Sequence, residues 1–574
     1  MTAMQAMPPS PTAPAETVLE LRELVVRTQS SPAKTILKGI SFDIAAGETL
    51  CLVGESGSGK SVTSLAIMGL LPKGILEVAR GEIHLERQAL LSATSRQLRD
   101  LRAQRVAMIF QEPMTALNPL MRVGEQIEEV LVMHQRGLSS GQRRERVLDM
   151  LDQVQLPDIE RVYESWPHQL SGGQRQRIMI AMALILEPRL LIADEPTTAL
   201  DVTTQQQILK LIKALQQRHG TSVLFITHDM GVVADIADRV CVMRHGEVVE
   251  TQPIEALLRH PRTDYTRQLL QAVPSLRPRP AREVMSPEVV LEAIELEMRY
   301  GGTSRWQRLR GQSGTGKLAA HDISFALRRG RTLGIVGESG SGKSTVARCV
   351  MRMIAPTGGG VRVLGKDIAS LGRAALKPHR KRIQMIFQDP FRSLNPRLTV
   401  GASLIEGPVN YGTPKAEALT RAAELLALVG LPEDALERYP HQFSGGQRQR
   451  IAIARALAME PDVLVADEAV SALDVSVQTQ VLALLADIQQ RLGVAVLFIT
   501  HDLRVAAQIC DEVMVMQQGE IVEYGPAGEV LGAPKHAYTQ SLMLAAPGRH
   551  WDFAGFKPLD EVYRAERPGV SLAR

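Results

Sequence analysis

Alternating and continuous apolar segments recur along the chain, and both kinds predict β-strands. Residues 18–24 and 290–296 alternate apolar with polar side chains, which is the period of a half-buried strand. Short continuous apolar runs are typical of strands buried in a parallel sheet. These runs occupy residues 50–53, 190–193 and 224–227 in the first half of the chain and 333–336, 463–466 and 497–500 in the second. Residues 178–186 form a longer apolar run that fits a buried helix.

A set of polar motifs accompanies these runs and occurs twice in the same order. The first copy comprises Gly54-Glu55-Ser56-Gly57-Ser58-Gly59-Lys60-Ser61, Gln111, Ser171-Gly172-Gly173-Gln174, Asp194-Glu195 and His228. The second copy comprises Gly337-Glu338-Ser339-Gly340-Ser341-Gly342-Lys343-Ser344, Gln388, Ser444-Gly445-Gly446-Gln447, Asp467-Glu468 and His501. A repeat this long indicates two complete domains rather than a solenoid of short units.

The composition is that of an ordinary globular protein. A chain of 574 residues is too long for one hydrophobic core, and 45% hydrophobic with 22% charged residues argues against wholesale disorder. A net charge of +4 without a Lys/Arg block gives no argument for nucleic-acid binding. Residues 1–16 lack the basic start and apolar core of a secretory signal, and we expect a disordered tail there. No run approaches the roughly 18 apolar residues that cross a bilayer, so a membrane function would need other subunits.

Four cysteines, Cys51, Cys241, Cys349 and Cys510, lie far apart without CxxC spacing. The spacing gives no reason to expect metal or Fe–S ligation, and we expect buried thiols in a reducing cytoplasm.

Each glycine-rich segment stands between a predicted strand and a predicted helix, which is the context of a phosphate-binding loop. Glycines let backbone N–H groups converge on phosphates, and the helix N-terminus adds positive potential. Lys60 and Lys343 would contact β/γ-phosphate oxygens, while Ser61 and Ser344 would ligate Mg²⁺. The expected ATP contacts are Gly54, Ser56, Gly57, Gly59, Lys60, Ser61 and Val62, and Gly337, Ser339, Gly340, Gly342, Lys343, Ser344 and Thr345.

Residues 311–317 have the same glycine and lysine spacing, but Leu318 follows in place of Ser or Thr. The preceding residues 305–310 are not a buried strand. We therefore predict a surface insertion without a nucleotide role.

Two acidic residues end one apolar run of each half. The C-terminal end of a parallel strand meets the ligand crevice of an α/β sheet. Asp194 and Asp467 would therefore hold Mg²⁺ through water, and Glu195 and Glu468 would polarise the attacking water as general bases.

Two further polar residues of each half also end apolar runs. His228 and His501 follow predicted strands, and we expect each to contact the γ-phosphate. Gln111 and Gln388 would sense Mg²⁺ and the attacking water.

The stretches Ser171 to Gln174 and Ser444 to Gln447 resemble the signature of ABC-type ATPases, and the complete motif set extends this resemblance over nearly the whole chain. Each signature opens a helix, whose N-terminal donors suit an anionic phosphate. The resemblance implies that the two halves pair within one chain and sandwich two ATP molecules head to tail. One ATP would lie between Lys60, Gln111, Asp194, Glu195, His228 and the signature Ser444, Gly445, Gly446 and Gln447. The other would lie between Lys343, Gln388, Asp467, Glu468, His501 and the signature Ser171, Gly172, Gly173 and Gln174.

The resemblance also implies the fold: two P-loop ABC nucleotide-binding domains in tandem, each with a RecA-like core, an antiparallel β subdomain and a helical signature subdomain. The expected divisions are a tail (1–16), domain 1 with a C-terminal extension (17–272), a proline-rich linker (273–288), domain 2 with its extension (289–548) and a tail (549–574). Both extensions contain a Tyr-Thr pair after a His, at Tyr265 and Tyr538. This repeat fits either a packing staple of a closing helix or a family-specific docking element.

The two halves depart from each other at a few positions. Tyr300 is placed to stack on adenine, whereas the corresponding first-half residue is Thr28. Phe443 replaces the usual signature leucine, and Ala469 replaces the proline seen as Pro196. Because no catalytic group is lost, we predict that both sites hydrolyse ATP.

Three classes of ABC protein pair such domains without membrane spans: importer motors, translation-associated proteins and DNA-repair ATPases. The chain has neither the charged helical linker of the second class nor the cysteine clusters of the third. Residues 111–119 and 388–396 resemble the loop that follows the glutamine in the dipeptide/oligopeptide/nickel importer family. The fused double-ATPase arrangement most resembles the glutathione-importing type.

This resemblance implies an ATP-driven motor on the cytoplasmic face of a bacterial inner membrane. It would energise uptake of peptides or glutathione through two integral-membrane permease subunits, fed by a periplasmic or extracytoplasmic solute-binding protein. We expect the permeases to dock around residues 121–164 and 397–438, and we expect no Fe–S cluster and no nucleic acid. The alternative is a soluble ABC ATPase that acts on ribosomes or nucleic acid. The motor itself need never touch the cargo.

Overall fold

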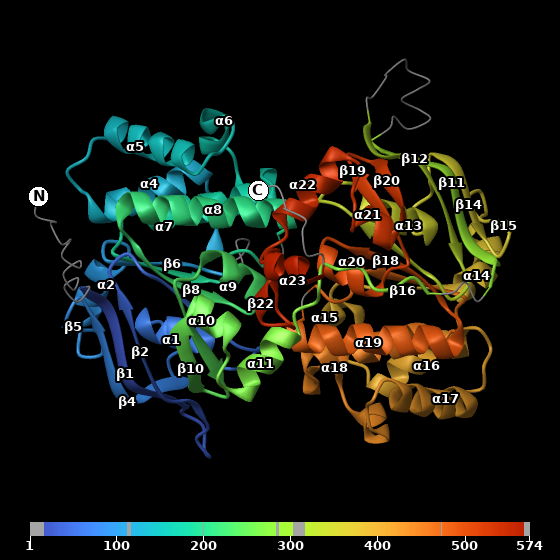
Figure 1. The fold of residues 1–574 in the computed structure, drawn as a ribbon, viewed down its shortest axis with the longest axis horizontal. Helices are drawn as coiled ribbons and strands as arrows, with labels where there is room; N and C mark the ends of the chain where they lie inside the picture. Colours follow the sequence, from blue (N-terminus) through green and yellow to red (C-terminus); the bar gives the residue numbers. More distant parts are fainter. Residues whose placement is uncertain are drawn as a thin grey trace, which may run out of the picture. The chain divides into compact units, whose positions relative to one another are not determined.

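The computed structural model describes residues 16–111, 116–198, 200–282, 286–301, 316–471 and 473–566. The chain divides into two compact units (Figure 1). Unit 1 comprises Met1–Leu200 and Thr204–Leu270, and unit 2 comprises Asp201–Thr203 and Gln271–Arg574. The predicted N-terminal tail up to residue 15, part of the loop after Gln111 and most of the segment 311–317 lie outside the described residues.

Unit 1 contains an antiparallel sheet of strand order β2-β1-β4-β5. Its strands are β1 (Thr17–Thr28), β2 (Thr35–Ala45), β4 (Leu76–Leu85) and β5 (Gln88–Ala89). The alternating segment 18–24 lies within β1, and Leu19, Leu21 and Leu24 are buried. The predicted half-buried strand is therefore confirmed.

The second sheet of unit 1 has the order β10-β9-β3-β8-β7-β6 and is parallel except for the pair β9 and β10. Its strands are β3 (Thr49–Val53), β6 (Val106–Ile109), β7 (Leu190–Asp194), β8 (Ser222–Thr227), β9 (Arg239–Arg244) and β10 (Glu247–Pro253). The three predicted apolar runs are β3, β7 and β8, and all three are buried along their length. Because they run parallel, the polar residues that follow them lie at one edge of the sheet.

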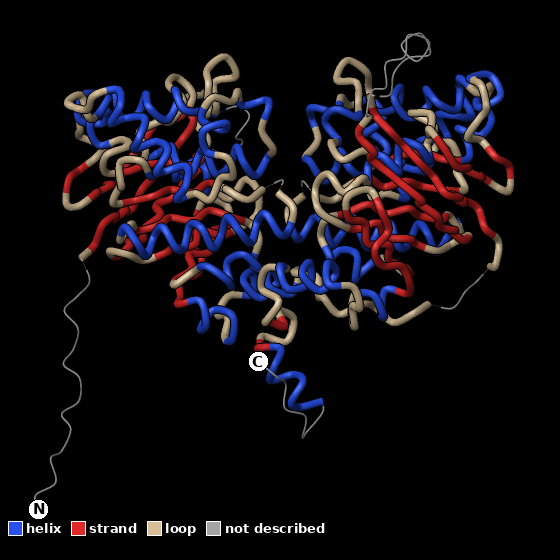
Figure 2. Tube along the Cα trace, turned by 90° about the horizontal axis from the view of Figure 1, so that it is seen from above, coloured by secondary structure: helices blue, strands red, loops and turns tan. Residues whose placement is uncertain are grey.

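Helices lie on both sides of the strands in each unit (Figure 2). Those of unit 1 are α1 (Lys60–Ile67), α2 (Ser95–Leu101), α4 (Val123–His134), α5 (Ser140–Gln153), α6 (Ile159–Tyr163), α7 (Gly172–Leu184), α8 (Val202–His219), α9 (Met230–Ile236), α10 (Ile254–Arg259) and α11 (Asp264–Gln271). The predicted buried helix corresponds to α7, in which Ile178, Ile180 and Ala181 are fully buried.

Unit 2 repeats the two sheets, with strand orders β12-β11-β14-β15 and β16-β17-β18-β13-β19-β20. Its strands are β11 (Val289–Tyr300), β12 (Lys317–Arg328), β13 (Thr332–Val336), β14 (Gly358–Val363), β15 (Lys366–Asp367), β16 (Ile383–Ile386), β17 (Val463–Asp467), β18 (Ala495–Thr500), β19 (Glu512–Gln517), β20 (Glu520–Pro526) and the short pair β21 (Trp551–Asp552) and β22 (Lys557–Pro558). Its helices are α13 (Lys343–Val350), α14 (Arg373–Arg382), α15 (Pro390–Ser393), α16 (Val400–Asn410), α17 (Lys415–Leu428), α18 (Gly445–Leu457), α19 (Val475–Leu492), α20 (Leu503–Ile509), α21 (Ala527–Val530), α22 (Ala537–Ala545) and α23 (Leu559–Glu566).

Lys317 is the last residue of segment 311–317, which has the glycine and lysine spacing of a phosphate-binding loop, and it begins strand β12. A phosphate-binding loop must lead into a helix N-terminus, so this segment lacks the required context.

The proline-rich segment that follows unit 1 packs against α20 and against Asp511, the residue that precedes β19. Arg504 donates to the Pro274 carbonyl at 2.8 Å. Arg279 and Arg282 each donate to Asp511, at 2.9 Å and 2.5 Å, and the Asp511 side chain is only 1% exposed. The described part of the linker is therefore attached to unit 2 by hydrogen bonds and ion pairs.

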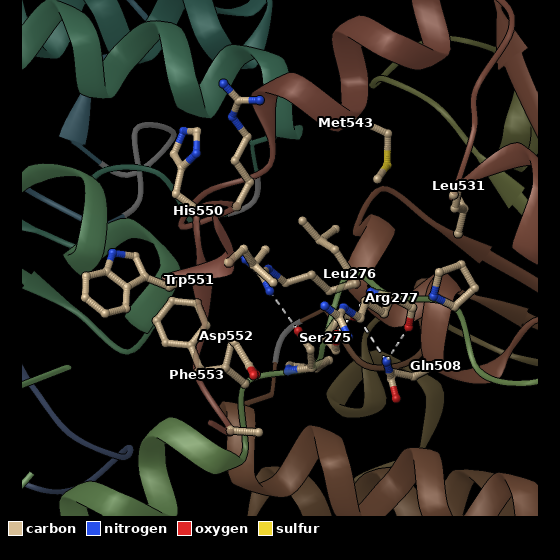
Figure 3. Close-up of a pocket in the computed structure, with 18 of the residues that line it drawn as sticks. Ser275, Leu276, Arg277, Gln508, Leu531, Met543, His550, Trp551, Asp552 and Phe553 are labelled. Carbon is tan, nitrogen blue, oxygen red and sulfur yellow. Dashed lines mark hydrogen bonds between the residues drawn. The ribbon is translucent and has the colours of Figure 1, made fainter. Parts of the chain in front are cut away.

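The same segment lines a cavity of about 1190 Å³ in unit 2, together with C-terminal residues around Trp551 and Phe553 (Figure 3). Gln508 donates to the Ser275 carbonyl at 2.9 Å on one wall.

Within the described residues, no helix combines the length and the apolar character that crossing a bilayer requires. All four cysteines are buried free thiols, as predicted.

Candidate active sites

The glycine-rich loop of each unit is held so tightly that its first position accepts only glycine. Gly54 has φ of 151°, and a Cβ there would lie 2.2 Å from the Met243 carbonyl oxygen of β9. Gly337 has φ of 150°, and its Cβ would lie 2.3 Å from the Met516 carbonyl oxygen. Both loops end in a glycine in the left-handed region, immediately before α1 and α13. The predicted strand, loop and helix N-terminus are thus all present.

The lysine of each loop is buried and folds back over the loop's first carbonyls. Lys60 Nζ donates to the Gly54 oxygen at 2.6 Å and to the Glu55 oxygen at 3.0 Å. Lys343 Nζ makes the corresponding bonds to Gly337 and Glu338 at 2.8 Å and 2.7 Å. Burial lowers the pKa of Lys343, although nearby carboxylates oppose this. An anionic phosphate at this position would stabilise the buried ammonium group.

A buried aspartate faces the serine that follows each lysine. Asp194 accepts hydrogen bonds from Ser61 and Ser64, both at 3.3 Å. Asp467 accepts one from Ser344 at 3.2 Å. Burial raises the pKa of both aspartates, so each carboxylate is incompletely stabilised. Hydroxyl and carboxylate oxygens are the ligands that Mg²⁺ prefers, and a cation would offset the desolvation, so these residues fit the ion.

Glu195, at the end of β7, is the centre of a polar cluster. Its carboxylate accepts hydrogen bonds from Gln111 Nε2 at 2.8 Å and Thr198 Oγ1 at 3.0 Å, and it lies 3.1 Å from His228 Nδ1. Burial would raise the pKa of Glu195, but His228 and Thr198 outweigh it, and the net effect lowers the pKa. The carboxylate is therefore held ionised, as a general base must be.

Glu468 also lies beside a glutamine and a histidine, but its histidine is farther away than that of Glu195. Gln388 Nε2 donates to it at 2.7 Å, and His501 Nδ1 lies 3.5 Å away. Burial opposes ionisation, but His501 lowers the pKa of Glu468, and Glu468 in turn raises the pKa of His501. Glu195 and Glu468 have φ of 47° and 48°, a left-handed conformation that costs a non-glycine residue free energy. The same costly geometry at both positions is typical of a functional site.

The signature segments begin helices α7 and α18. The side chains of Ser171 and Gln174 cap α7 reciprocally, and Ser444 and Gln447 cap α18 in the same way. The second signature glycine of each unit packs closely against a side chain of the following helix. A Cβ on Gly173 would lie 2.7 Å from Thr204, and one on Gly446 would lie 2.3 Å from Val477.

The positions at which the two halves differ lie at strand ends or in the core. Tyr300 ends β11, and 39% of its surface is exposed. Thr28 ends β1, and its hydroxyl accepts a hydrogen bond from the Lys34 backbone. Phe443 and Ala469 are buried in the core of unit 2.

The structure thus brings together, within each unit, the predicted lysine, serine, aspartate, glutamate, glutamine and histidine. Sequence reasoning missed Ser64 and Thr198, for which the motifs gave no signal. It noticed Tyr265 and Tyr538, but not that their hydroxyl groups accept hydrogen bonds from the glycine-rich loops.

Comparison with known proteins shows which family the chain belongs to. A family model described as "ABC transporter" matches residues 37–198 and 320–471, and one described as "Oligopeptide/dipeptide transporter, C-terminal region" matches residues 249–293 and 522–555. Glutathione import ATP-binding protein GsiA of Salmonella paratyphi A is 47% identical over 89% of this chain and 86% of its own length. The protein of that name from Escherichia coli O157:H7 is 46% identical over 94% of this chain and 91% of its own. A solved dimeric ATP-binding cassette bound to ADP and Pi matches at 31% identity, over 41% of this chain and 98% of its own, with a TM-score of 0.37.

Proposed function

The chain belongs to the ABC transporter family as the ATPase motor of an oligopeptide/glutathione-type importer, and we propose that both of its units bind and hydrolyse ATP. The observation that carries this proposal is the complete polar cluster around Glu195 and its counterpart around Glu468. Each lies in the same unit as a phosphate-binding loop with a buried lysine. Each cluster holds a glutamate beside a glutamine and a histidine, which are the groups expected to act on the attacking water and the γ-phosphate.

The residues of each cluster have distinct roles in this proposal. The backbone N–H groups of the loop and Lys60 or Lys343 would bind the β- and γ-phosphates. Glu195 or Glu468 would orient the attacking water and accept its proton, and His228 or His501 would contact the γ-phosphate.

Mg²⁺ is assigned to Ser61, Gln111 and Asp194 in unit 1 and to Ser344, Gln388 and Asp467 in unit 2. When bound, the ion neutralises charge on the phosphate oxygens. The paired arrangement, in which the signature of one unit completes the site of the other, is part of the proposal as well.

The importer assignment implies two permease subunits at a bacterial inner membrane and an extracytoplasmic solute-binding protein. Support comes from apolar side chains exposed near the start and end of α4, which lies in the region expected to dock. Leu120 is 81% exposed and Met133 is 66% exposed. Peptides or glutathione are the proposed cargo class, since the relatives named above are called glutathione import proteins.

Co-purification with the membrane subunits tests the importer assignment. We expect the intact chain to retain two hydrophobic permease subunits and the Met133→Glu variant to lose them. Leu91→Glu is the matched control, because Leu91 is also exposed but lies in a different part of unit 1. Recovery of ribosomes or DNA in place of permeases would contradict the assignment.

A further inference from the structure

A tyrosine from each C-terminal extension contacts the phosphate-binding loop of its own unit. Tyr265, on α11, accepts a hydrogen bond from the Glu55 N–H at 3.3 Å. Tyr538, on α22, accepts one from the Glu338 N–H at 3.0 Å. Both tyrosines are buried, with 7% and 8% of their surface exposed. Each lies about 200 residues further along the chain than the loop that its hydroxyl contacts.

The peptide that donates to the tyrosine also binds the catalytic lysine. The carbonyl of the Gly54–Glu55 peptide accepts the bond from Lys60, while the N–H of that same peptide binds Tyr265. In a trans peptide these two groups point in opposite directions. The lysine and the tyrosine therefore hold one peptide plane from its two sides, and a rotation of the plane would break both bonds. The second unit has the same arrangement around the Gly337–Glu338 peptide.

The segment that carries each tyrosine is itself anchored to the sheet. Glu250 of β10 accepts hydrogen bonds from the backbone of Arg262 and Thr263, at 2.8 Å and 3.0 Å. Glu523 of β20 accepts the corresponding bonds from Lys535 and His536, at 2.9 Å and 3.2 Å. The tyrosine hydroxyl is thus presented to the loop from a fixed position, which a packing staple alone would not require.

We propose that Tyr265 and Tyr538 are positioning residues for ATP binding, each of which fixes the first peptide of a phosphate-binding loop and, through its carbonyl, the lysine. The inference rests on the proposed role of Lys60 and Lys343 as phosphate ligands. A loop held in its binding conformation loses less freedom when the nucleotide arrives, so loss of the hydroxyl weakens ATP binding. One neutral hydrogen bond corresponds to a change of about 3–10-fold in affinity.

Substitutions that remove only the hydroxyl group test the inference in the full chain. Tyr265→Phe is measured in a Lys343→Ala background, in which only unit 1 binds nucleotide. Tyr538→Phe is measured in a Lys60→Ala background. The probe is a ribose-labelled fluorescent ATP analogue with Mg²⁺, and the thermal unfolding midpoint is recorded for every variant. Tyr524→Phe is the matched control, because the Tyr524 hydroxyl bonds Glu512 at 2.9 Å and not the loop.

The expected result is an affinity reduced about 3–10-fold in both tyrosine variants, with the unfolding midpoint and the Tyr524→Phe affinity unchanged. Unchanged affinity in both tyrosine variants would overturn the inference alone. An equal loss of affinity in Tyr524→Phe, or a loss that only follows a lowered midpoint, would also overturn it, since that is the effect of weakened packing. If the double variant Lys60→Ala and Lys343→Ala still binds the analogue, the lysine assignment fails first and the inference falls with it.

Discussion

The two units share one arrangement of catalytic groups but support it differently. In unit 1, Asp194 receives two hydroxyl groups, because Ser64 joins Ser61. In unit 2 the position corresponding to Ser64 is Ala347, and Asp467 receives a single hydroxyl.

The glutamates differ in the same way. Thr198 donates to the Glu195 carboxylate, whereas Ser471 donates to the backbone carbonyl of Glu468 at 3.0 Å. Each lysine nevertheless donates to the two corresponding carbonyls of its own loop. The groups expected to bind the phosphates and Mg²⁺ are therefore alike in the two units, whereas the residues that support them are not.

A second difference concerns the aspartate that precedes β9 and β19. Asp238 accepts a bond from the Thr49 backbone at 2.8 Å, and Asp511 accepts the corresponding bond from Thr332 at 2.8 Å. Only Asp511 also pairs with the linker arginines. Unit 2 thus uses a shared strand contact to attach the linker.

The largest expected effect is a loss of ATP binding when the first glycine of either phosphate-binding loop is replaced, and it should be the same in both units. Gly54→Ala and Gly337→Ala each force a Cβ onto a backbone carbonyl in an unfavourable conformation, and a cost of about 3 kcal/mol corresponds to roughly 100-fold weaker ATP binding by that unit. Titration with ATP in the matching single-site background measures it. Gly47→Ala and Gly330→Ala are controls, since these glycines also have positive φ, of 72° and 70°, but a Cβ there meets open space. A large loss of affinity in only one unit would contradict the claim that the two loops are equally constrained.

The next effect distinguishes the two units. Asp511→Asn leaves two arginines without their buried partner and is expected to destabilise unit 2 by about 3 kcal/mol. Asp238→Asn weakens one backbone hydrogen bond and is expected to cost unit 1 about 1 kcal/mol. Urea unfolding followed by hydrogen exchange at β3 and β13 measures both. Equal costs would contradict the special role of Asp511.

The cost of Asp511→Asn is also expected to depend on pH. Burial opposes ionisation, but Arg282, the Thr332 N–H and Arg279 outweigh it and lower the pKa of Asp511. A lowered pKa contributes stability that is fully present above the ordinary aspartate value of about 3.9 and is lost as the pH falls through the lower folded value. The difference between Asp511→Asn and the unsubstituted chain should therefore shrink in acid. A difference that stays constant down to about pH 2 would contradict this.

The smallest effect concerns the extra hydroxyl in unit 1. Ser64→Ala makes the surroundings of Asp194 like those of Asp467, at a cost of about 1 kcal/mol or less. We expect Mg²⁺-dependent ATP binding by unit 1 to weaken by no more than about 5-fold. A loss above about 10-fold would mean that the two sites differ in more than their support.

Much of the fold and most of the site could be predicted from the sequence. Apolar runs identified β3, β7 and β8, and the polar residues after parallel strands necessarily lie at one edge of the sheet. Glycine, lysine and serine at this spacing in a strand-to-helix connection are typical of phosphate binding, so the sequence alone predicts both loops.

The supporting contacts could not be predicted, because they depend on side-chain positions that no local pattern encodes. Ser64 is one more serine in a helix until Asp194 is placed beside it. The repeated Tyr-Thr pair marked Tyr265 as unusual, but its partner Glu55 is 210 positions away in the sequence. The proline-rich segment predicted a linker, whereas its attachment to Asp511 required the structure.

The central claim, that both units hydrolyse ATP, is tested most directly by Glu195→Gln and Glu468→Gln. Glutamine keeps the size of the side chain but cannot accept the proton of the attacking water. Steady-state phosphate release from the full chain should fall in each single variant and by at least about 100-fold in the double variant, while ATP binding persists. If either single change leaves turnover untouched, the unit that carries it is catalytically silent and the account is wrong.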